Sequence, residues 1–128
     1  MKLSIVVPCY NESRNIPLLV ERFEKVWQKQ PAIEVVIVNN GSRDDSAEVL
    51  KSLGSQYSFL KIVTVPVNQG YGFGILTGLQ AASGDYLGWT HADLQTDPRD
   101  IVRAYEIIQK EHFPEHMYVK GRRGNRPF

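Results

Sequence analysis

Two patterns of apolar and polar positions alternate along the chain. Short runs of consecutive apolar, β-branched residues predict buried strands, and longer segments with an apolar residue every three or four positions predict helices. The strands are expected at residues 2–8, 32–38, 59–66, 84–95 and 116–121. The helices are expected between them, at residues 12–30, 43–56, 68–83 and 97–111. This alternation predicts an α/β fold with a mostly parallel sheet and helices on both of its faces.

Composition and charge narrow the function classes. The 128 residues suffice for one hydrophobic core, and because no repeat or linker interrupts them we expect a single domain over residues 1–128. A formal net charge of +1 provides no strong field for nucleic acid, which is therefore not an expected partner. The single cysteine, Cys9, rules out an internal disulfide and a cysteine-based zinc cluster. The N-terminal apolar run is too short for a signal peptide and no run reaches membrane-spanning length, so we expect a cytoplasmic protein.

Polar and glycine-rich segments follow four of the expected strands. They are residues 8–12, 39–42, 67–72 and 91–98. In an open parallel sheet, ligands bind outside the carboxyl ends of the strands. We therefore expect these four segments to form one binding site at one edge of the sheet.

The segment "HADLQ" is the most informative of the four. If the chain stays extended there, the side chains of His91, Asp93 and Gln95 share one face. An imidazole, a carboxylate and an amide oxygen could hold a divalent cation and leave open positions for phosphate oxygens. The alternative is that Asp93 and Asp97 cap the following helix while His91 lies on the surface.

The glycines of "NQGYGFG" raise the possibility of dinucleotide binding, but the spacing G-x-G-x-x-G fails from either starting glycine. A dinucleotide-dependent oxidoreductase is therefore disfavoured. Tight turning and close helix packing by Gly74 and Gly78 is the better interpretation. Backbone N–H groups near Gly70 facing a ligand phosphate remain a second possibility.

The segment "PCYNE" offers an aromatic ring and a carboxylate. Tyr10 could stack on a base, and Glu12 could accept hydrogen bonds from a base or ribose. Equally, Glu12 could simply favour the N-terminus of the following helix. Cys9 is interpreted as a small buried residue, because no histidine is close in sequence to activate it.

Together these segments resemble the family 2 glycosyltransferases of the GT-A fold. The likeness is closest to the dolichyl- and undecaprenyl-phosphate sugar transferases, which include dolichol-phosphate mannosyltransferase. It covers nearly the whole chain, and it is the order and spacing of the motifs that make it specific. The motifs are "SIVVPCYNE", "VIVNNGSRDDS", "NQGYGFGILTGLQAASGDYLGWTHADLQTDP" and "VKGRR".

The resemblance implies a nucleotide-sugar donor, a divalent metal (Mn²⁺ or Mg²⁺) and sugar transfer with inversion. The donor-binding residues that it implies are Pro8, Tyr10, Glu12, Asn39, Gly70, Ala92 and Asp93. Asp93 is also the catalytic candidate, and His91, Asp93 and Gln95 match the metal-binding "DAD-x-Q" segment of the family. The implied fold is a Rossmann-like GT-A domain, truncated at its C-terminus and comprising the donor-binding half.

Two departures from the family pattern concern charge. Asn39 and Asn40 stand where the family has "DD", so amide groups replace two carboxylates; an amide oxygen can still accept from a base N–H. His91 replaces the first Asp of "DAD". Because imidazole suits Mn²⁺ better than Mg²⁺, we expect either manganese or a metal held mainly by Asp93 and Gln95.

The acceptor expected from the resemblance is a polyprenyl phosphate, which would bring the protein to the cytoplasmic face of a membrane. Its phosphate oxygen is already ionised near neutral pH, so cationic groups help more than a general base. A basic cluster near the C-terminus could serve this purpose or could be a solvated tail. It consists of Lys120, Arg122, Arg123 and Arg126. The alternative function is a nucleotide-sugar-binding fragment without turnover.

Overall fold

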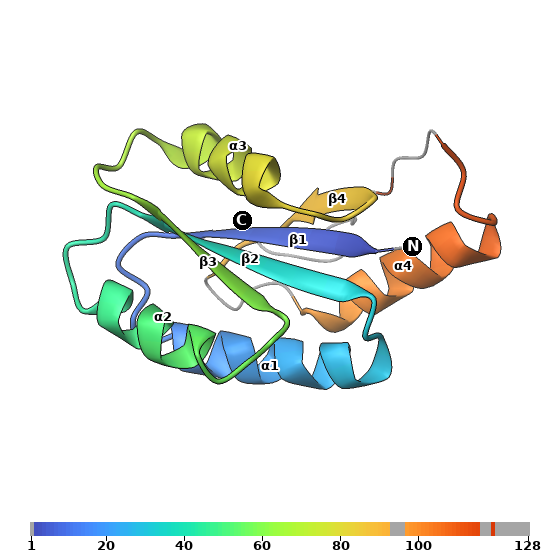
Figure 1. Cartoon of the computed structure of the whole chain (residues 1–128), viewed down its shortest axis with the longest axis horizontal. Helices are drawn as coiled ribbons and strands as arrows, with labels where there is room; N and C mark the ends of the chain where they lie inside the picture. The colour runs from blue at the N-terminus through green and yellow to red at the C-terminus, as the bar shows by residue number, and fades with distance from the viewer. Residues whose placement is uncertain (1, 93–96, 116–118, 120–128) are drawn as a thin grey trace, which may run out of the picture.

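A computed structural model describes residues 2–92, 97–115 and 119 of the chain. Strands and helices alternate in sequence (Figure 1). They are β1 (Leu3–Cys9), α1 (Ile16–Lys29), β2 (Ile33–Asn40), α2 (Ser46–Gly54), β3 (Leu60–Val65), α3 (Tyr71–Ala81), β4 (Tyr86–Trp89) and α4 (Arg99–Lys110). The four strands form one parallel sheet in the order β3-β2-β1-β4. The α/β fold with a parallel sheet is therefore confirmed.

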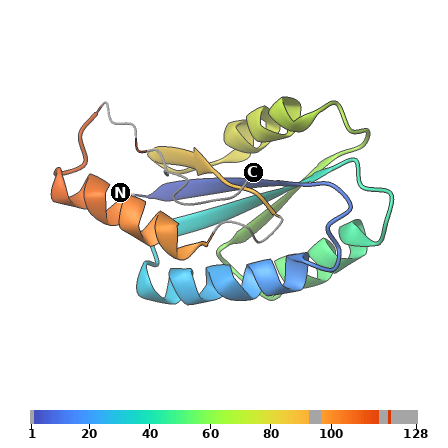
Figure 2. The ribbon, with the colours of Figure 1, turned by 180° about the vertical axis from the view of Figure 1, so that it is seen from behind.

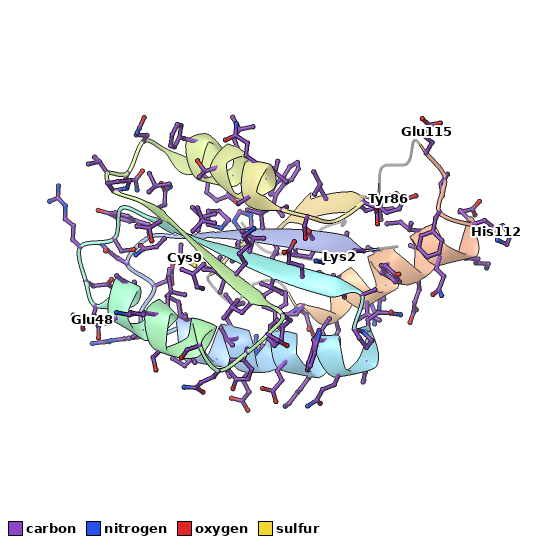
Figure 3. All side chains as sticks on the ribbon, viewed as in Figure 1. Lys2, Cys9, Glu48, Tyr86, His112 and Glu115 are labelled. Carbon is purple, nitrogen blue, oxygen red and sulfur yellow. The ribbon has the colours of Figure 1, made fainter. Side chains whose placement is uncertain are left out.

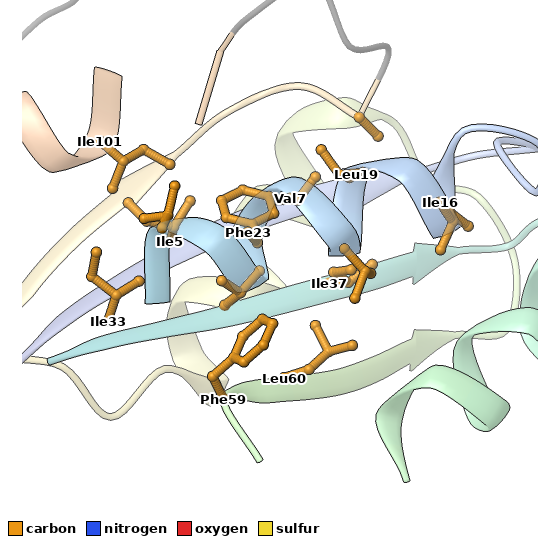
Figure 4. Close-up of a cluster of buried hydrophobic side chains, with 14 of the residues drawn as sticks. Ile5, Val7, Ile16, Leu19, Phe23, Ile33, Ile37, Phe59, Leu60 and Ile101 are labelled. Carbon is orange, nitrogen blue, oxygen red and sulfur yellow. The ribbon is translucent and has the colours of Figure 1, made fainter. Parts of the chain in front are cut away.

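Helices cover both faces of the sheet, as the sequence predicts. Helices α1, α2 and α4 lie on one face and α3 lies on the other (Figures 1 and 2). Every residue of β1 is buried, because β1 is central and carries apolar side chains to both faces. Ile5 and Val7 pack against the α1 side, whereas Val6 packs in the smaller cluster on the α3 side (Figure 4 shows the larger cluster).

Helix α3 lies close to the sheet because two of its glycines face the strands. A Cβ atom on Gly78 would lie 2.3 Å from Val6 Cγ1 and 2.8 Å from Val38 Cγ2. On Gly74 it would lie 2.9 Å from the Asn40 amide nitrogen. The predicted role of Gly74 and Gly78 in close helix packing is therefore confirmed.

Element boundaries differ from the sequence prediction at the edge of the sheet. Within the described part of the strand expected at 84–95, β4 covers only Tyr86–Trp89. Leu87 and Trp89 are exposed because side chains alternate along a strand, and only the face that carries Tyr86 packs against the larger core cluster. Helix α4 begins at Arg99 with Pro98 as the N-cap residue, two positions after the expected start at residue 97. Asp97 still contributes, since its Oδ1 accepts from the Arg99 N–H at 2.9 Å.

The strand expected at 116–121 lies outside the described residues, apart from position 119. Within the described part of the chain, no helix combines the length and the apolar character needed to cross a membrane.

Candidate functional site: a pocket at the carboxyl ends of the strands

A pocket of about 170 Å³ lies where β1, β2 and β4 end and where α3 begins. Its lining comes from segments far apart in sequence, which the parallel sheet brings to one edge. The lining residues are Pro8, Cys9, Tyr10, Glu12, Asn40, Tyr71, His91 and Ala92. Among the lining residues that the structure describes, Glu12 is the one carboxylate.

The turn after β1 places an aromatic ring and a carboxylate at the pocket. Tyr10 is 43% exposed, so its ring is accessible to a ligand. The Glu12 carbonyl oxygen accepts from the N–H groups of Asn15 and Ile16, and its carboxylate accepts from Asn15 Nδ2 at 2.7 Å. Glu12 thus precedes α1 and lines the pocket, and its hydrogen bonding to a base or ribose stays a prediction.

Cys9 is buried at the C-terminal end of β1, and Lys2 directly precedes the other end of this strand (Figure 3). The pKa of the Cys9 thiol is raised to about 12, mainly by burial and to a smaller extent by the negative charge of Glu12. The thiol is therefore protonated at neutral pH and is a poor nucleophile. The interpretation of Cys9 as a small buried residue is confirmed.

Asn39 and Asn40 point to opposite faces of β2, because side chains alternate along a strand. Asn39 Oδ1 accepts from the Ser42 N–H at 3.2 Å, and Asn39 does not line the pocket. Asn40 lies on the α3 side and donates from Nδ2 to the Gly70 carbonyl at 3.1 Å. Its Oδ1 is buried and has no hydrogen-bond partner among the described residues.

The sequence prediction selected Asn39 from this pair and did not give Asn40 a role. The missed signal is the alternation of side chains between the two faces of a strand. Counting every second residue from Val36 and Val38 places Asn40, and not Asn39, on the face that α3 covers.

Gly70 joins the β3–α3 connection to Asn40. Its φ of 101° is a backbone conformation that favours glycine. The Gly70 N–H donates to Asn68 Oδ1 at 2.7 Å, and its carbonyl accepts from Asn40 and from the Gly74 N–H. Because its own N–H is already used, Gly70 shapes the start of α3 and does not itself offer a donor.

Tyr71 and His91 form a pair across the pocket. The Tyr71 hydroxyl lies 3.0 Å from His91 Nδ1, and the two rings are stacked with their centroids 5.4 Å apart and their planes 17° apart. Sequence reasoning missed Tyr71, which was visible only as an aromatic residue inside a glycine-rich turn.

The predicted metal ligands are only partly described. His91 lines the pocket, whereas Asp93 and Gln95 lie outside the described residues, as does the basic cluster from Lys120 to Arg126. Among the residues that the structure does describe, no three His, Cys, Asp or Glu side chains are grouped to hold a metal ion.

The structure thus gathers most of the predicted donor-binding residues into one pocket. Those that line it are Pro8, Tyr10, Glu12 and Ala92, and the predicted metal ligand His91 lines it too. Asn39 and Gly70 are near it in the fold but do not line it.

Comparison with known proteins identifies the family. The model of "Glycosyl transferase family 2" matches residues 4–124, almost the complete chain. The chain belongs to glycosyl transferase family 2.

Two curated relatives within this family have the same name, undecaprenyl-phosphate 4-deoxy-4-formamido-L-arabinose transferase. The one from Yersinia enterocolitica is 35% identical over 113 residues, which are 85% of this chain and 34% of the relative. The one from Pseudomonas savastanoi pv. phaseolicola is 36% identical over 111 residues, 84% of this chain and 33% of the relative. The chain spans about one third of the length of these relatives. This confirms the resemblance to polyprenyl-phosphate sugar transferases within the family.

Solved structures confirm the GT-A fold. TarS 1–349 from S. aureus in complex with UDP superposes with a TM-score of 0.73 at 24% identity, over 88% of this chain and 33% of that one. The mannosyltransferase PcManGT from Pyrobaculum calidifontis, in complex with GDP-Man and Mn²⁺, superposes with a TM-score of 0.67 at 23% identity. The superposition covers 84% of this chain and 32% of the mannosyltransferase chain.

Proposed function

We propose that this chain is the donor-binding part of an inverting glycosyltransferase. It would move a sugar from a UDP- or GDP-sugar to an acceptor, which we take to be a polyprenyl phosphate. The observation that carries this proposal is the pocket itself, which unites residues from three separate family motifs at the carboxyl edge of the sheet. The relatives named as undecaprenyl-phosphate transferases support the choice of acceptor.

The nucleotide is assigned to the β1 side of the pocket. There the exposed ring of Tyr10 is available for stacking on the base. The carboxylate of Glu12 keeps acceptor capacity beside its bond to Asn15, because a carboxylate has about four acceptor positions. It can therefore accept from ribose hydroxyls or from a base N–H, while Pro8 and Ala92 supply apolar walls.

The diphosphate is assigned to the side where β4 ends. The carboxylate of Asp93 and the amide oxygen of Gln95 are hard oxygen donors, which Mn²⁺ and Mg²⁺ accept as ligands. They therefore fit a divalent metal in their chemistry, with or without His91. A bound divalent ion would neutralise the negative charge that develops on the leaving diphosphate.

The proposed transfer is a direct displacement. An anionic oxygen of the acceptor phosphate forms a bond to the anomeric carbon while the bond from that carbon to the diphosphate oxygen breaks. The nucleoside diphosphate leaves with the electron pair, and attack from the opposite side inverts the configuration. The acceptor oxygen carries no proton, so the step requires no general base. The proposal places Lys120, Arg122, Arg123 and Arg126 beside the acceptor phosphate, at the cytoplasmic face of a membrane.

Release of nucleoside diphosphate tests this function. The chain is mixed with UDP- and GDP-sugars, Mn²⁺ and undecaprenyl phosphate in detergent, and free UDP or GDP is measured. An active transferase releases nucleoside diphosphate in an acceptor-dependent manner, and Asp93→Ala abolishes the release. Donor binding without any release would instead identify a nucleotide-sugar-binding protein without turnover.

A further inference from the structure

The turn after β1 contains a residue in an unusual backbone conformation. Asn11 has a φ of 52°, in the left-handed region that residues other than glycine rarely adopt, although asparagine is among the more frequent exceptions. It stands between Tyr10 and Glu12, which both line the pocket, whereas Asn11 itself does not line it. The two residues assigned to the nucleotide are thus joined by one whose side chain serves another purpose.

That purpose is a contact between two loops. Asn11 Oδ1 accepts from the Arg43 N–H at 2.8 Å and, in a longer bond, from the Asp44 N–H at 3.4 Å. The Asn11 N–H donates to Ser42 Oγ at 3.0 Å. We call these contacts of Asn11 with residues 42–44 the loop clamp. A glycine would meet the backbone requirement alone, so the clamp, which spans more than 30 positions of the chain, is what requires the amide.

The loop between β2 and α2 is a well-packed anchor for the clamp. The Ser42 N–H donates to Asn39 Oδ1 at 3.2 Å, and Asn39 is buried at the end of β2. Gly41 has a φ of 70°, and a Cβ atom on it would overlap the backbone of Asn68. The loop therefore lies directly against the β3–α3 connection as well as against the turn that contains Asn11.

We propose that Asn11 is a positioning residue for the nucleoside: through the loop clamp it holds the ring of Tyr10 and the carboxylate of Glu12 where a ligand in the pocket meets them. The inference rests on the proposed function, because it takes the ligand to be a nucleotide. Asn11 acts through its two neighbours and does not touch the ligand. Asn39 then contributes to nucleotide binding indirectly, by supporting the loop to which Asn11 is fixed.

The clamp favours binding because it orders the turn before a ligand arrives. A turn that is already fixed loses less conformational freedom on binding than a free one, so less of the interaction energy is spent on ordering it. Ser13, on the other side of Glu12, donates from its N–H to Asp44 Oδ2 at 3.4 Å. The residues before and after Glu12 are therefore both held by the same loop.

Amide hydrogen exchange, followed by NMR, observes the clamp itself. In the wild type we expect the Arg43 N–H to exchange more slowly than in an unstructured peptide, because it donates to Asn11 Oδ1. Asn11→Gly permits the same backbone conformation and removes the acceptor, so this protection should disappear. Asn11→Asp keeps an acceptor oxygen and should retain most of it. An unprotected Arg43 N–H in the wild type would overturn the proposal.

Nucleotide affinity tests whether the clamp serves binding. UDP and GDP are titrated calorimetrically in EDTA at about 0.15 M salt, which screens much of the interaction between exposed charges. We expect Asn11→Gly to weaken binding of the better nucleotide about tenfold, because the ligand must now order the freed turn. Asn11→Asp should stay within about threefold of the wild type, since its carboxylate accepts from the same N–H groups. The corresponding monophosphate should lose as much affinity as the diphosphate, because the clamp acts on the nucleoside.

A second left-handed residue provides the matched control. His112 has a φ of 61° and lies toward the Lys2 end of the sheet, far from Cys9 at the pocket (Figure 3). His112→Gly makes the same kind of backbone change as Asn11→Gly, and it should leave nucleotide affinity unchanged. Equal losses of affinity in the two variants would show a general loosening of the fold and would overturn the positioning role.

The outcomes separate this inference from the proposed function. A wild type that binds neither UDP nor GDP overturns both. A wild type that binds, with Asn11→Gly at wild-type affinity, overturns this inference alone. An Asn11→Asp variant that binds as weakly as Asn11→Gly also overturns it, because the acceptor oxygen would then not be the cause. Thermal unfolding midpoints show that each variant is folded at the temperature of the titration.

Discussion

Two adjacent asparagines on β2 have different tasks because they face opposite sides of the sheet. Asn40 donates to the Gly70 carbonyl, a bond that a carboxylate cannot make. Asn39 accepts from the Ser42 N–H, a bond that a carboxylate makes equally well. The amide at position 40 thus makes a bond that depends on its N–H₂ group, whereas the bond of position 39 needs only an oxygen.

Replacing each asparagine by aspartate tests this difference. Asn40→Asp removes the donor and places a buried carboxylate beside a carbonyl oxygen, so we expect it to lower the free energy of unfolding by about 1–3 kcal/mol. Asn39→Asp is the matched control at an equally buried position and should lower it by clearly less, since its acceptor is kept. Urea denaturation measures both. Equal losses in the two variants would contradict the assigned roles.

Helix α3 depends on a glycine at its contact with the sheet. Gly78 lies against Val6 and Val38, so the helix can approach β1 and β2 more closely than any other residue would permit. This approach also brings the start of α3, with Tyr71, to the pocket edge.

An alanine at the contact should therefore destabilise the protein. The added methyl group of Gly78→Ala would overlap Val6 Cγ1, and overpacking of this kind costs about 1–3 kcal/mol. Gly72→Ala is the control in the same helix. Its methyl group meets no atom of the described residues within 4 Å, so it should be neutral or stabilise by up to about 1 kcal/mol. Thermal unfolding compares the two variants. A Gly78→Ala protein as stable as Gly72→Ala would show that α3 does not pack as described.

A partly exposed network of hydrogen bonds ties the starts of three strands together on the edge opposite the pocket. Glu34 on β2 accepts from Ser4 Oγ on β1 at 2.6 Å and from the Ser83 N–H before β4 at 2.9 Å. Lys2 Nζ lies 3.8 Å from its carboxylate. Burial acts to raise the pKa of Glu34, but the hydrogen bonds from Ser4 and Ser83 and the charge of Lys2 outweigh it and lower the pKa.

This pKa predicts a loss of stability in acid. A carboxyl whose pKa is lower in the folded than in the unfolded protein stabilises the fold above its unfolded value, about 4.5, and loses that contribution as the pH falls below it. At pH 7 we expect Glu34→Gln to be less stable than the wild type by about 1–3 kcal/mol. The difference should shrink in urea denaturation between pH 5 and pH 3. A difference that does not vary with pH would contradict the account.

The sequence predicted most of the fold because the signal there is strong. The uninterrupted apolar runs of β1 and β2 can only be central strands, and the small residues of α3 indicate close packing. The predicted range of β4, 84–95, is longer than the observed strand, because an apolar run followed by polar residues does not show where pairing with β1 ends. The asparagine facing the pocket could be found by counting along the strand. The partnership of Tyr71 with His91 could not, since it depends on how the β3–α3 connection meets the end of β4 in space.

The central claim is that the pocket at the carboxyl edge of the sheet binds a nucleoside diphosphate together with a divalent metal. The most direct test is the shift in thermal unfolding midpoint caused by UDP and by GDP, each with and without Mn²⁺, in the wild type and in Asp93→Ala. We expect one nucleotide to raise the midpoint of the wild type, more strongly with Mn²⁺, and the Mn²⁺-dependent part to disappear in Asp93→Ala. If neither nucleotide shifts the wild-type midpoint under any of these conditions, the pocket is not a donor site and the account is contradicted.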